Sequence, residues 1–202
     1  MTSIKIRVGS VPRGKPTPVF LDLFCRSLII LCTSLSVVLS SVAVCDGHWL
    51  RAGHRMFGLW YFCSLEDQQS INVSSNCTTH LEESGVTGAG SGLPVCRSVI
   101  TLAVVSAIFG LELLVMSQAS EGRDSSRRWT LGAKLVLLAA LMSAGGVGTF
   151  VLLFGSYATL LGFTLTFWCQ FTATFLFFLN AMAARHIQNI SMLPPSGKPY
   201  KL

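Results

Sequence analysis

Charged side chains are scarce in this sequence. They make up 12% of its 202 residues, whereas 51% of the residues are hydrophobic. A soluble domain carries about twice that share of charge, so the composition excludes an ordinary water-soluble globular protein. The deficit is explained if much of the chain lies in lipid.

Recognisable catalytic motifs are also missing. The sequence contains no Gly-x-Ser-x-Gly, no His-Glu-x-x-His and no phosphate-binding glycine loop. Three histidines, His48, His54 and His80, lie near cysteines, but their spacing is not that of a zinc site. We therefore predict that the protein is not an enzyme and has no cofactor or metal site.

Long apolar runs account for the low charge. Each is long enough to cross a hydrocarbon core of about 30 Å as a helix rising about 1.5 Å per residue. None contains proline, and all are longer than the strands of a membrane barrel. We predict an all-α membrane protein with one domain, 1–202, whose four spans are 27–44, 98–117, 131–154 and 160–184.

Lysine and arginine are distributed unevenly around these runs. Twelve of the fifteen lie in 1–26, in 118–130, just inside the third run or in 185–202. Basic residues favour the cytoplasmic side, which predicts cytoplasmic termini, a large extracellular loop at 45–97 and a short one at 155–159. The net charge of +6 thus indicates topology and attraction to anionic membrane lipid, not nucleic-acid binding.

One alternative concerns the first apolar run. Its end, Ser41-Val42-Ala43, resembles a signal-peptidase site. Cleavage there would leave three spans and an outside N-terminus. Both the run and the tail before it are long for a signal peptide, so we favour an uncleaved first span and a multi-pass protein of the plasma membrane.

The large loop carries two glycosylation sequons. Asn72-Val73-Ser74 and Asn76-Cys77-Thr78 both fall on the side assigned outside by charge. Asn72 is the better candidate, because the second sequon has cysteine in its middle position. A third match, at Asn189, is cytoplasmic in this topology and is disregarded.

Four cysteines, Cys45, Cys63, Cys77 and Cys96, lie in or beside this loop, on an oxidising face where disulfides persist. Joining Cys63 to Cys77 closes a loop of about 15 residues, worth about 3 kcal/mol in the chain-entropy model. Cys45 and Cys96, near the outer ends of the first two spans, form a candidate second pair. Four cysteines allow three pairings, and the sequence does not choose among them.

The loop also has a recurrent aromatic motif. Trp49, Gly58-Leu59-Trp60, Cys63 and Cys77, after the first span of a four-span chain, resemble the pattern of the claudin, peripheral myelin protein and calcium-channel gamma-subunit superfamily. Four further segments resemble its gamma-like calcium-channel members: 44–50, 57–60, 107–112 and 162–165.

The resemblance implies a left-handed four-helix bundle with a small extracellular antiparallel β-sheet formed by the first loop. It further implies that Trp60 anchors this sheet on the bundle and that Cys63–Cys77 joins two of its strands. An aromatic ring at a membrane interface suits such a role, since its surroundings are half apolar and half wet.

Polar residues inside the predicted spans are few. Glu112 lies well inside the second span, where a charge costs ~2.5–3.5 kcal/mol on insertion scales. We expect it to pair with Lys134 or to bond Gln170. The alternative is a contact with an arginine in the voltage sensor of a partner.

Small residues recur every fourth position in two spans. Ala140, Ala144 and Gly148 do so in the third span, and Ser106 and Gly110 in the second. Such spacing lets helices approach closely. It favours packing within the bundle over a surface for a partner's helix.

Two functions are compatible with these features. The first is an auxiliary gamma-like subunit that binds the pore-forming alpha-1 subunit of a voltage-gated calcium channel and stabilises an inactivated or closed state. The second is a claudin-like junction or adhesion protein. The short second loop and the predicted glycans favour the first. An autonomous pore is disfavoured, because few polar groups line the spans.

Overall fold

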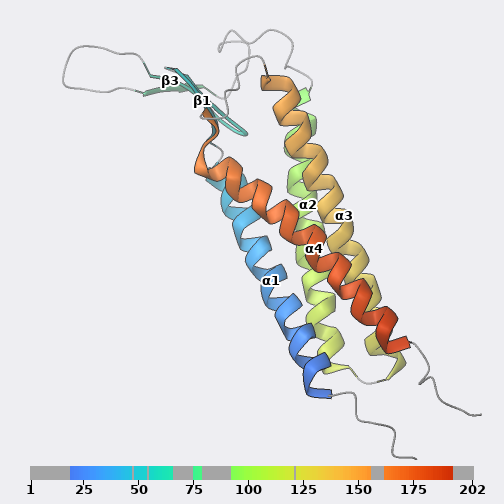
Figure 1. Cartoon of the computed structure of the whole chain (residues 1–202). Coiled ribbons are helices and arrows are strands. Elements are labelled where there is room, and N and C mark those ends of the chain that lie inside the picture. The colour runs from blue at the N-terminus through green and yellow to red at the C-terminus, as the bar shows by residue number, and fades with distance from the viewer. Residues whose placement is uncertain are drawn as a thin grey trace, which may run out of the picture.

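Four long helices form the body of the protein. The computed structural model describes residues 19–46, 48–53, 55–65, 75–78, 92–120, 122–155 and 162–192. The helices are α1 (Val19–Asp46), α2 (Gly92–Ala119), α3 (Arg123–Phe154) and α4 (Leu165–Met192). All four are long and apolar enough to cross a membrane. The predicted multi-pass helical bundle is therefore confirmed (Figure 1).

The helices extend beyond the apolar runs that predicted them. α3 begins at Arg123, eight residues before the expected span, and α4 continues to Met192. Hydropathy marks only the part of a helix that lies in hydrocarbon. Backbone hydrogen bonding continues into the polar interface, so the helices are longer than the runs.

The α2–α3 pair makes the closest backbone approach found at the described glycines. A Cβ atom added to Gly132 would lie 2.9 Å from the Gly110 carbonyl oxygen, and one added to Gly110 would lie 3.1 Å from the Val136 nitrogen. Only glycine fits both positions. The expected packing role of Ala144 and Gly148 is wrong: Ala144 is exposed, and a Cβ on Gly148 would meet nothing within 4 Å. Ala140 alone of the three is buried in the core, so a spacing of four residues did not identify the contacting face of α3.

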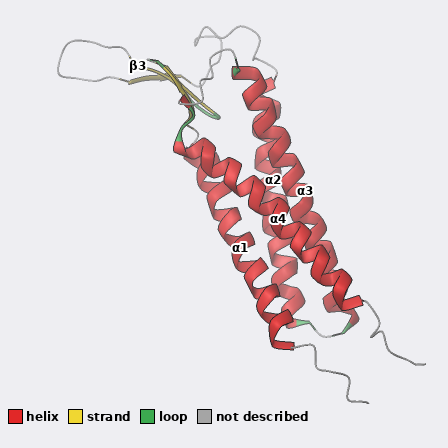
Figure 2. Ribbon diagram, in the orientation of Figure 1, coloured by secondary structure: helices red, strands yellow, loops and turns green. Residues whose placement is uncertain are grey.

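A four-stranded antiparallel sheet of order β1-β2-β3-β4 lies at one end of the bundle, past the end of α1 and the start of α4 (Figure 2). We call this the sheet end. Its strands are β1 (His48–Ala52), β2 (Arg55–Gly58), β3 (Phe62–Leu65) and β4 (Ser75–Thr78). The predicted small sheet after the first helix is thus confirmed.

At the opposite end, α1 begins, α2 passes into α3, and α4 finishes (Figure 1). We call this the basic end, since α1, α3 and α4 bring most of the described cations there. Arg26 of α1 lies 5.0 Å from the ring centroid of buried Trp129, whose indole nitrogen donates to the Ala184 carbonyl of α4 at 3.0 Å. The described basic residues of the basic end are Arg26, Arg123, Arg127, Arg128, Lys134 and Arg185.

Candidate functional site

Both tryptophans of the loop motif bond the end of α1. Trp49 Nε1 donates to the Ala43 carbonyl at 3.0 Å, and Trp60 Nε1 donates to the Val44 carbonyl at 2.8 Å. The last carbonyls of a helix have no partner within it. Each indole therefore satisfies a helix carbonyl while fixing the sheet onto α1.

The Trp49 ring also reaches α3 and α4. It is fully buried and packs edge-on against Phe150 and Phe167, with ring centroids 4.9 and 5.9 Å apart. The Trp49 carbonyl accepts from Thr164 N at 3.1 Å. The next residue, Leu50, forms an antiparallel β-bridge with Phe163. One tryptophan thus joins β1 to three helices.

Arg97, at the start of α2, supports the second tryptophan. Its guanidinium lies 5.4 Å from the centroid of the Trp60 ring, and its Nε donates to the carbonyl of fully buried Leu59. Gly58 closes the same turn, donating its N–H to the Tyr61 carbonyl at 3.0 Å. The Gly58-Leu59-Trp60 segment is therefore a structural joint between the sheet, α1 and α2.

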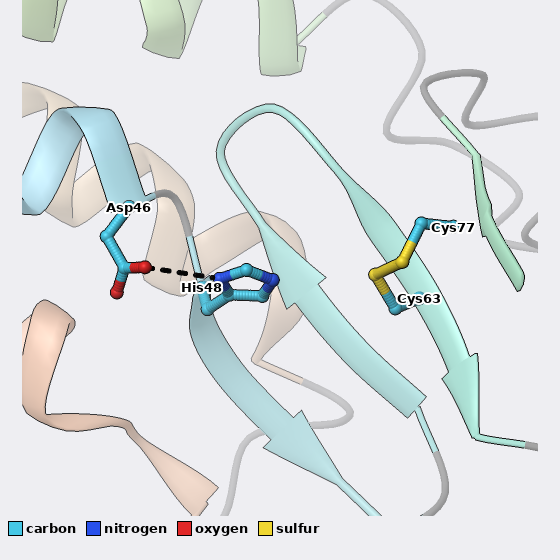
Figure 3. The surroundings of a disulfide bond; sticks show 4 residues. All are labelled: Asp46, His48, Cys63 and Cys77. Atoms are coloured by element: carbon cyan, nitrogen blue, oxygen red, sulfur yellow. Dashed lines mark ion pairs between the residues drawn. A yellow bond between two sulfur atoms is a disulfide. The ribbon is translucent and has the colours of Figure 1, made fainter. Parts of the chain in front are cut away.

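A disulfide joins Cys63 of β3 to Cys77 of β4 (Figure 3). The strand register places the two residues opposite each other. The candidate second pair is wrong, because both Cys45 and Cys96 are free. Cys96 is buried inside α2, and its thiol donates to the Gly146 carbonyl of α3 at 3.2 Å, whereas Cys45 is exposed.

The remaining loop predictions are only partly within the described chain. Asn72 lies outside it, and Asn76 lies in β4, paired in register with Ser64. Of the loop histidines, His48 lies 3.5 Å from the Asp46 carboxylate (Figure 3), while His54 and His80 fall outside the described residues.

Gln170 is the centre of a buried polar network inside the bundle. Its Oε1 accepts from Ser40 of α1 at 3.0 Å, and its Nε2 donates to Ser143 of α3 at 2.7 Å. Ser143 in turn lies 2.6 Å from the Thr174 hydroxyl. The amide therefore satisfies both its ends with hydroxyls on α1 and α3, and the expected bond to Glu112 is absent from the described residues.

Glu112 and Lys134 do not pair. Both side chains are exposed, and within the described part of the chain neither has an ion-pair partner. The reason is helical geometry. Gly110 and Gly132 face each other across the α2–α3 contact, and a residue two positions further along a helix of 3.6 residues per turn lies on the opposite side. Both charges therefore point out of the bundle.

The surroundings of Glu112 on α2 are apolar. The positions three and four residues away share its face, and all four side chains there are exposed: Ile108, Phe109, Val115 and Met116. The Glu112 carboxylate thus lies at the centre of an exposed apolar surface on a helix that is long and apolar enough to cross a membrane. We call these five residues the Glu112 face.

Comparison with known proteins identifies the family. The sequence model of the voltage-dependent calcium channel gamma-like subunit protein family matches residues 9–192. The chain belongs to this family. It is also similar to the human protein named voltage-dependent calcium channel gamma-like subunit, with 48% identity over 193 residues, which are 95% of this chain and 98% of the human one.

The family is named for a channel subunit, which is not a class of enzyme. Sequence reasoning missed Arg97 as the support of Trp60, and Gly132 as the partner of Gly110. The only sequence signal for Arg97 was its position at the end of a predicted span. The only signal for Gly132 was that it is a glycine within a span, and neither signal identifies a partner until the pairing of the helices is known.

Proposed function

We propose that this chain is an auxiliary subunit of a voltage-gated calcium channel and that it binds the pore-forming alpha-1 subunit through the Glu112 face. The observation that carries the proposal is the exposed, unpaired carboxylate on an apolar face of a membrane-spanning helix. Membership of a family named for a channel subunit supports the same partner.

The energetics favour a cationic partner inside the membrane. Glu112 lies about 10 Å from the midpoint of α2 at about 1.5 Å per residue, which is within the hydrocarbon depth. An isolated charge there is costly, and intramembrane ionisable residues generally face protein or pair. An arginine of a voltage-sensing helix would supply the opposite charge, and the flanking apolar side chains would pack against the same helix.

Such a contact biases gating if the arginine is available in one channel state more than in another. A ligand shifts a conformational equilibrium only by its difference in affinity for the two states. A difference of about 1.4 kcal/mol changes the ratio of states about tenfold. We propose that the favoured state is inactivated or closed.

Replacing the charge tests the contact. Glu112→Gln is expected to lower co-purification with the alpha-1 subunit about tenfold, equivalent to about 1.4 kcal/mol. The shift in steady-state inactivation caused by the subunit is expected to shrink in parallel in current recordings. Glu112→Asp keeps the charge and is expected to retain most of the effect.

Asp124→Asn is the matched control, because it removes one exposed carboxylate at the basic end of α3, outside the Glu112 face. It is expected to change neither measurement. If Glu112→Gln lowered the stability of the bundle and left channel regulation intact, the partner contact would be wrong. Recruitment of the protein to cell contacts without any change in current would favour a junction role instead.

The proposed orientation puts both termini in the cytoplasm and the sheet outside the plasma membrane. The described chain gathers six of its basic residues at the end opposite the sheet, in agreement with the charge rule. In this orientation the sequons at Asn72 and Asn76 face the secretory lumen, and we expect Asn72 to be glycosylated.

Glycosidase treatment of the full-length protein from mammalian cells tests the orientation. Digestion is expected to increase gel mobility, and Asn72→Gln is expected to remove most of that change. Asn189→Gln is the control at the other end of the bundle and is expected to leave the glycosylated band unchanged. If only the Asn189 variant lost the glycan, the orientation of the protein in the membrane would be opposite to the one proposed.

A further inference from the structure

A surface groove runs along the first turns of α3 at the basic end. Its volume is about 410 Å³, and it is open to its surroundings. Residues at spacings of three, four, seven and eleven share a helix face, so the side chains that line it point the same way. They are three cations, two hydroxyl residues and one leucine: Arg123, Arg127, Lys134, Ser126, Thr130 and Leu131.

In the part of the chain that the structure describes, the three cations of this groove form no ion pair. Among the described residues, the ion pairs are Arg26–Asp22 and His48–Asp46, and neither involves the groove. Arg26 is further occupied by the Trp129 ring. Even with exposed Asp124 next to Arg123, the groove therefore has a net positive charge, which favours a phosphate-bearing anion.

Ser126 adds a neutral donor to the same groove. Its hydroxyl oxygen accepts from the Gln188 amide of α4. In that bond Ser126 is the acceptor, so its own proton remains to be donated. A phosphate oxygen among the three cations is a suitable acceptor for it.

The position of the groove along α3 corresponds to a membrane interface. If the hydrocarbon begins near Phe154, about 20 residues of helix cross its ~30 Å, and the crossing ends near Lys134. Arg127 and Arg123 then lie about 10 and 16 Å beyond the end of the crossing, so their long side chains have to reach back towards the headgroups. Lys134 lies at the boundary, where a long basic side chain reaches the headgroups.

A second groove, of about 200 Å³ and almost entirely apolar, lies between α3 and α4. Leu141 and Ala144 line it from α3, and Phe171 and Phe175 line it from α4. Leu141 is two turns from Lys134 on the same face of α3, about 10 Å along the axis. The charged groove is thus followed, towards the membrane centre, by an apolar one.

We propose that these two grooves form a site for one anionic phospholipid from the leaflet at the basic end. Its phosphate-bearing headgroup occupies the groove lined by Arg123, Arg127 and Lys134, and one acyl chain follows α3 to the groove beside Ala144. The site does not depend on the proposed channel contact, since it lies on α3 and α4 and not on the Glu112 face.

Lipid binding to the full-length protein in phosphatidylcholine nanodiscs tests the proposal. The probes are fluorescent phosphatidylinositol bisphosphate and fluorescent phosphatidylserine. A direct charge-assisted hydrogen bond from an arginine to a phosphate oxygen is worth at least about fivefold in affinity. The double variant Arg123→Gln/Arg127→Gln is therefore expected to lose about 25-fold. Arg128→Gln removes the same charge one residue away but outside the groove, and it is expected to change affinity less than twofold.

The second arm separates a lipid from a free phosphate compound. Ala144→Phe fills the apolar groove at an exposed position. It is expected to weaken lipid binding several-fold and to leave binding of soluble inositol trisphosphate unchanged. Thermal stability of each variant in detergent is expected to equal that of the parent protein, because the replaced side chains are exposed.

Equal losses in the Arg128 variant and the double variant, counted per charge, would mean diffuse attraction to the membrane surface and would overturn the site. Unchanged lipid binding in the Ala144 variant, with soluble inositol trisphosphate bound as tightly as the lipid, would overturn the acyl-chain part and leave a site for free phosphate compounds.

Discussion

Trp49→Ala is expected to lower the free energy of unfolding by about 3–5 kcal/mol, the usual cost of truncating a large buried aromatic side chain. The ring has no exposed surface and contacts Phe150 and Phe167. Its indole also satisfies the Ala43 carbonyl of α1. Loss of one side chain therefore loosens the sheet from three helices at once.

The effect can be measured by thermal unfolding in detergent and by proteolysis of the sheet segment. Trp168→Ala is the matched control, because Trp168 lies on α4 with 44% of its surface exposed and is expected to cost far less. Trp49→Phe keeps a buried aromatic ring but removes the N–H together with part of the indole. It is expected to cost about 1–3 kcal/mol through the unsatisfied carbonyl.

A Trp49 variant no less stable than the Trp168 variant would contradict this role. It would mean that the sheet is held on the bundle mainly by Trp60 and its bond to the Val44 carbonyl. Channel regulation would then be expected to survive loss of Trp49, and the loop motif would have to be explained otherwise.

Gly132→Ala is expected to destabilise the protein by about 1–3 kcal/mol, the cost of overpacking a tight contact. The added methyl would lie 2.9 Å from the Gly110 carbonyl oxygen and 3.1 Å from the Leu114 nitrogen. Because both neighbours are backbone atoms, no side-chain rotation relieves the contact. α2 and α3 have to separate.

Gly145→Ala is the control on the same helix, where the new methyl meets nothing within 4 Å. It is expected to be neutral or to stabilise α3 by up to about 1 kcal/mol, since alanine is the better helix former. The two identical substitutions thus have opposite expected signs in a thermal-unfolding measurement. Equal behaviour of both variants would exclude the close α2–α3 approach.

The spans, the sheet and the family were accessible from local sequence. About 30 Å of hydrocarbon demands a long apolar run, whatever the helix later packs against. The loop motif could be recognised locally, because Trp49, Gly58 and Trp60 follow α1 closely in sequence, although their contacts reach α2, α3 and α4. Such features depend on residue type and spacing along one element.

The site residues inside the membrane depended on more than spacing. Glu112, Lys134 and Gln170 were expected to satisfy one another, since each is costly alone in lipid. Gln170 instead bonds Ser40 and Ser143, and the two charged residues face outward. Hydroxyl groups of the bundle satisfy Gln170, whereas we propose partners outside this chain for Glu112 and Lys134.

The sequence by itself determined that four helices cross a membrane, that a motif-bearing segment follows the first, and that basic residues gather at one end. Only the tertiary structure decided which face of each helix is inside. Rotation of a helix about its axis by half a turn exchanges Gly110 for Glu112 at the contact, and apolar residues on all sides leave that angle open. The backbone contact between Gly110 and Gly132 sets the rotation, and with it the outward direction of Glu112 and Lys134.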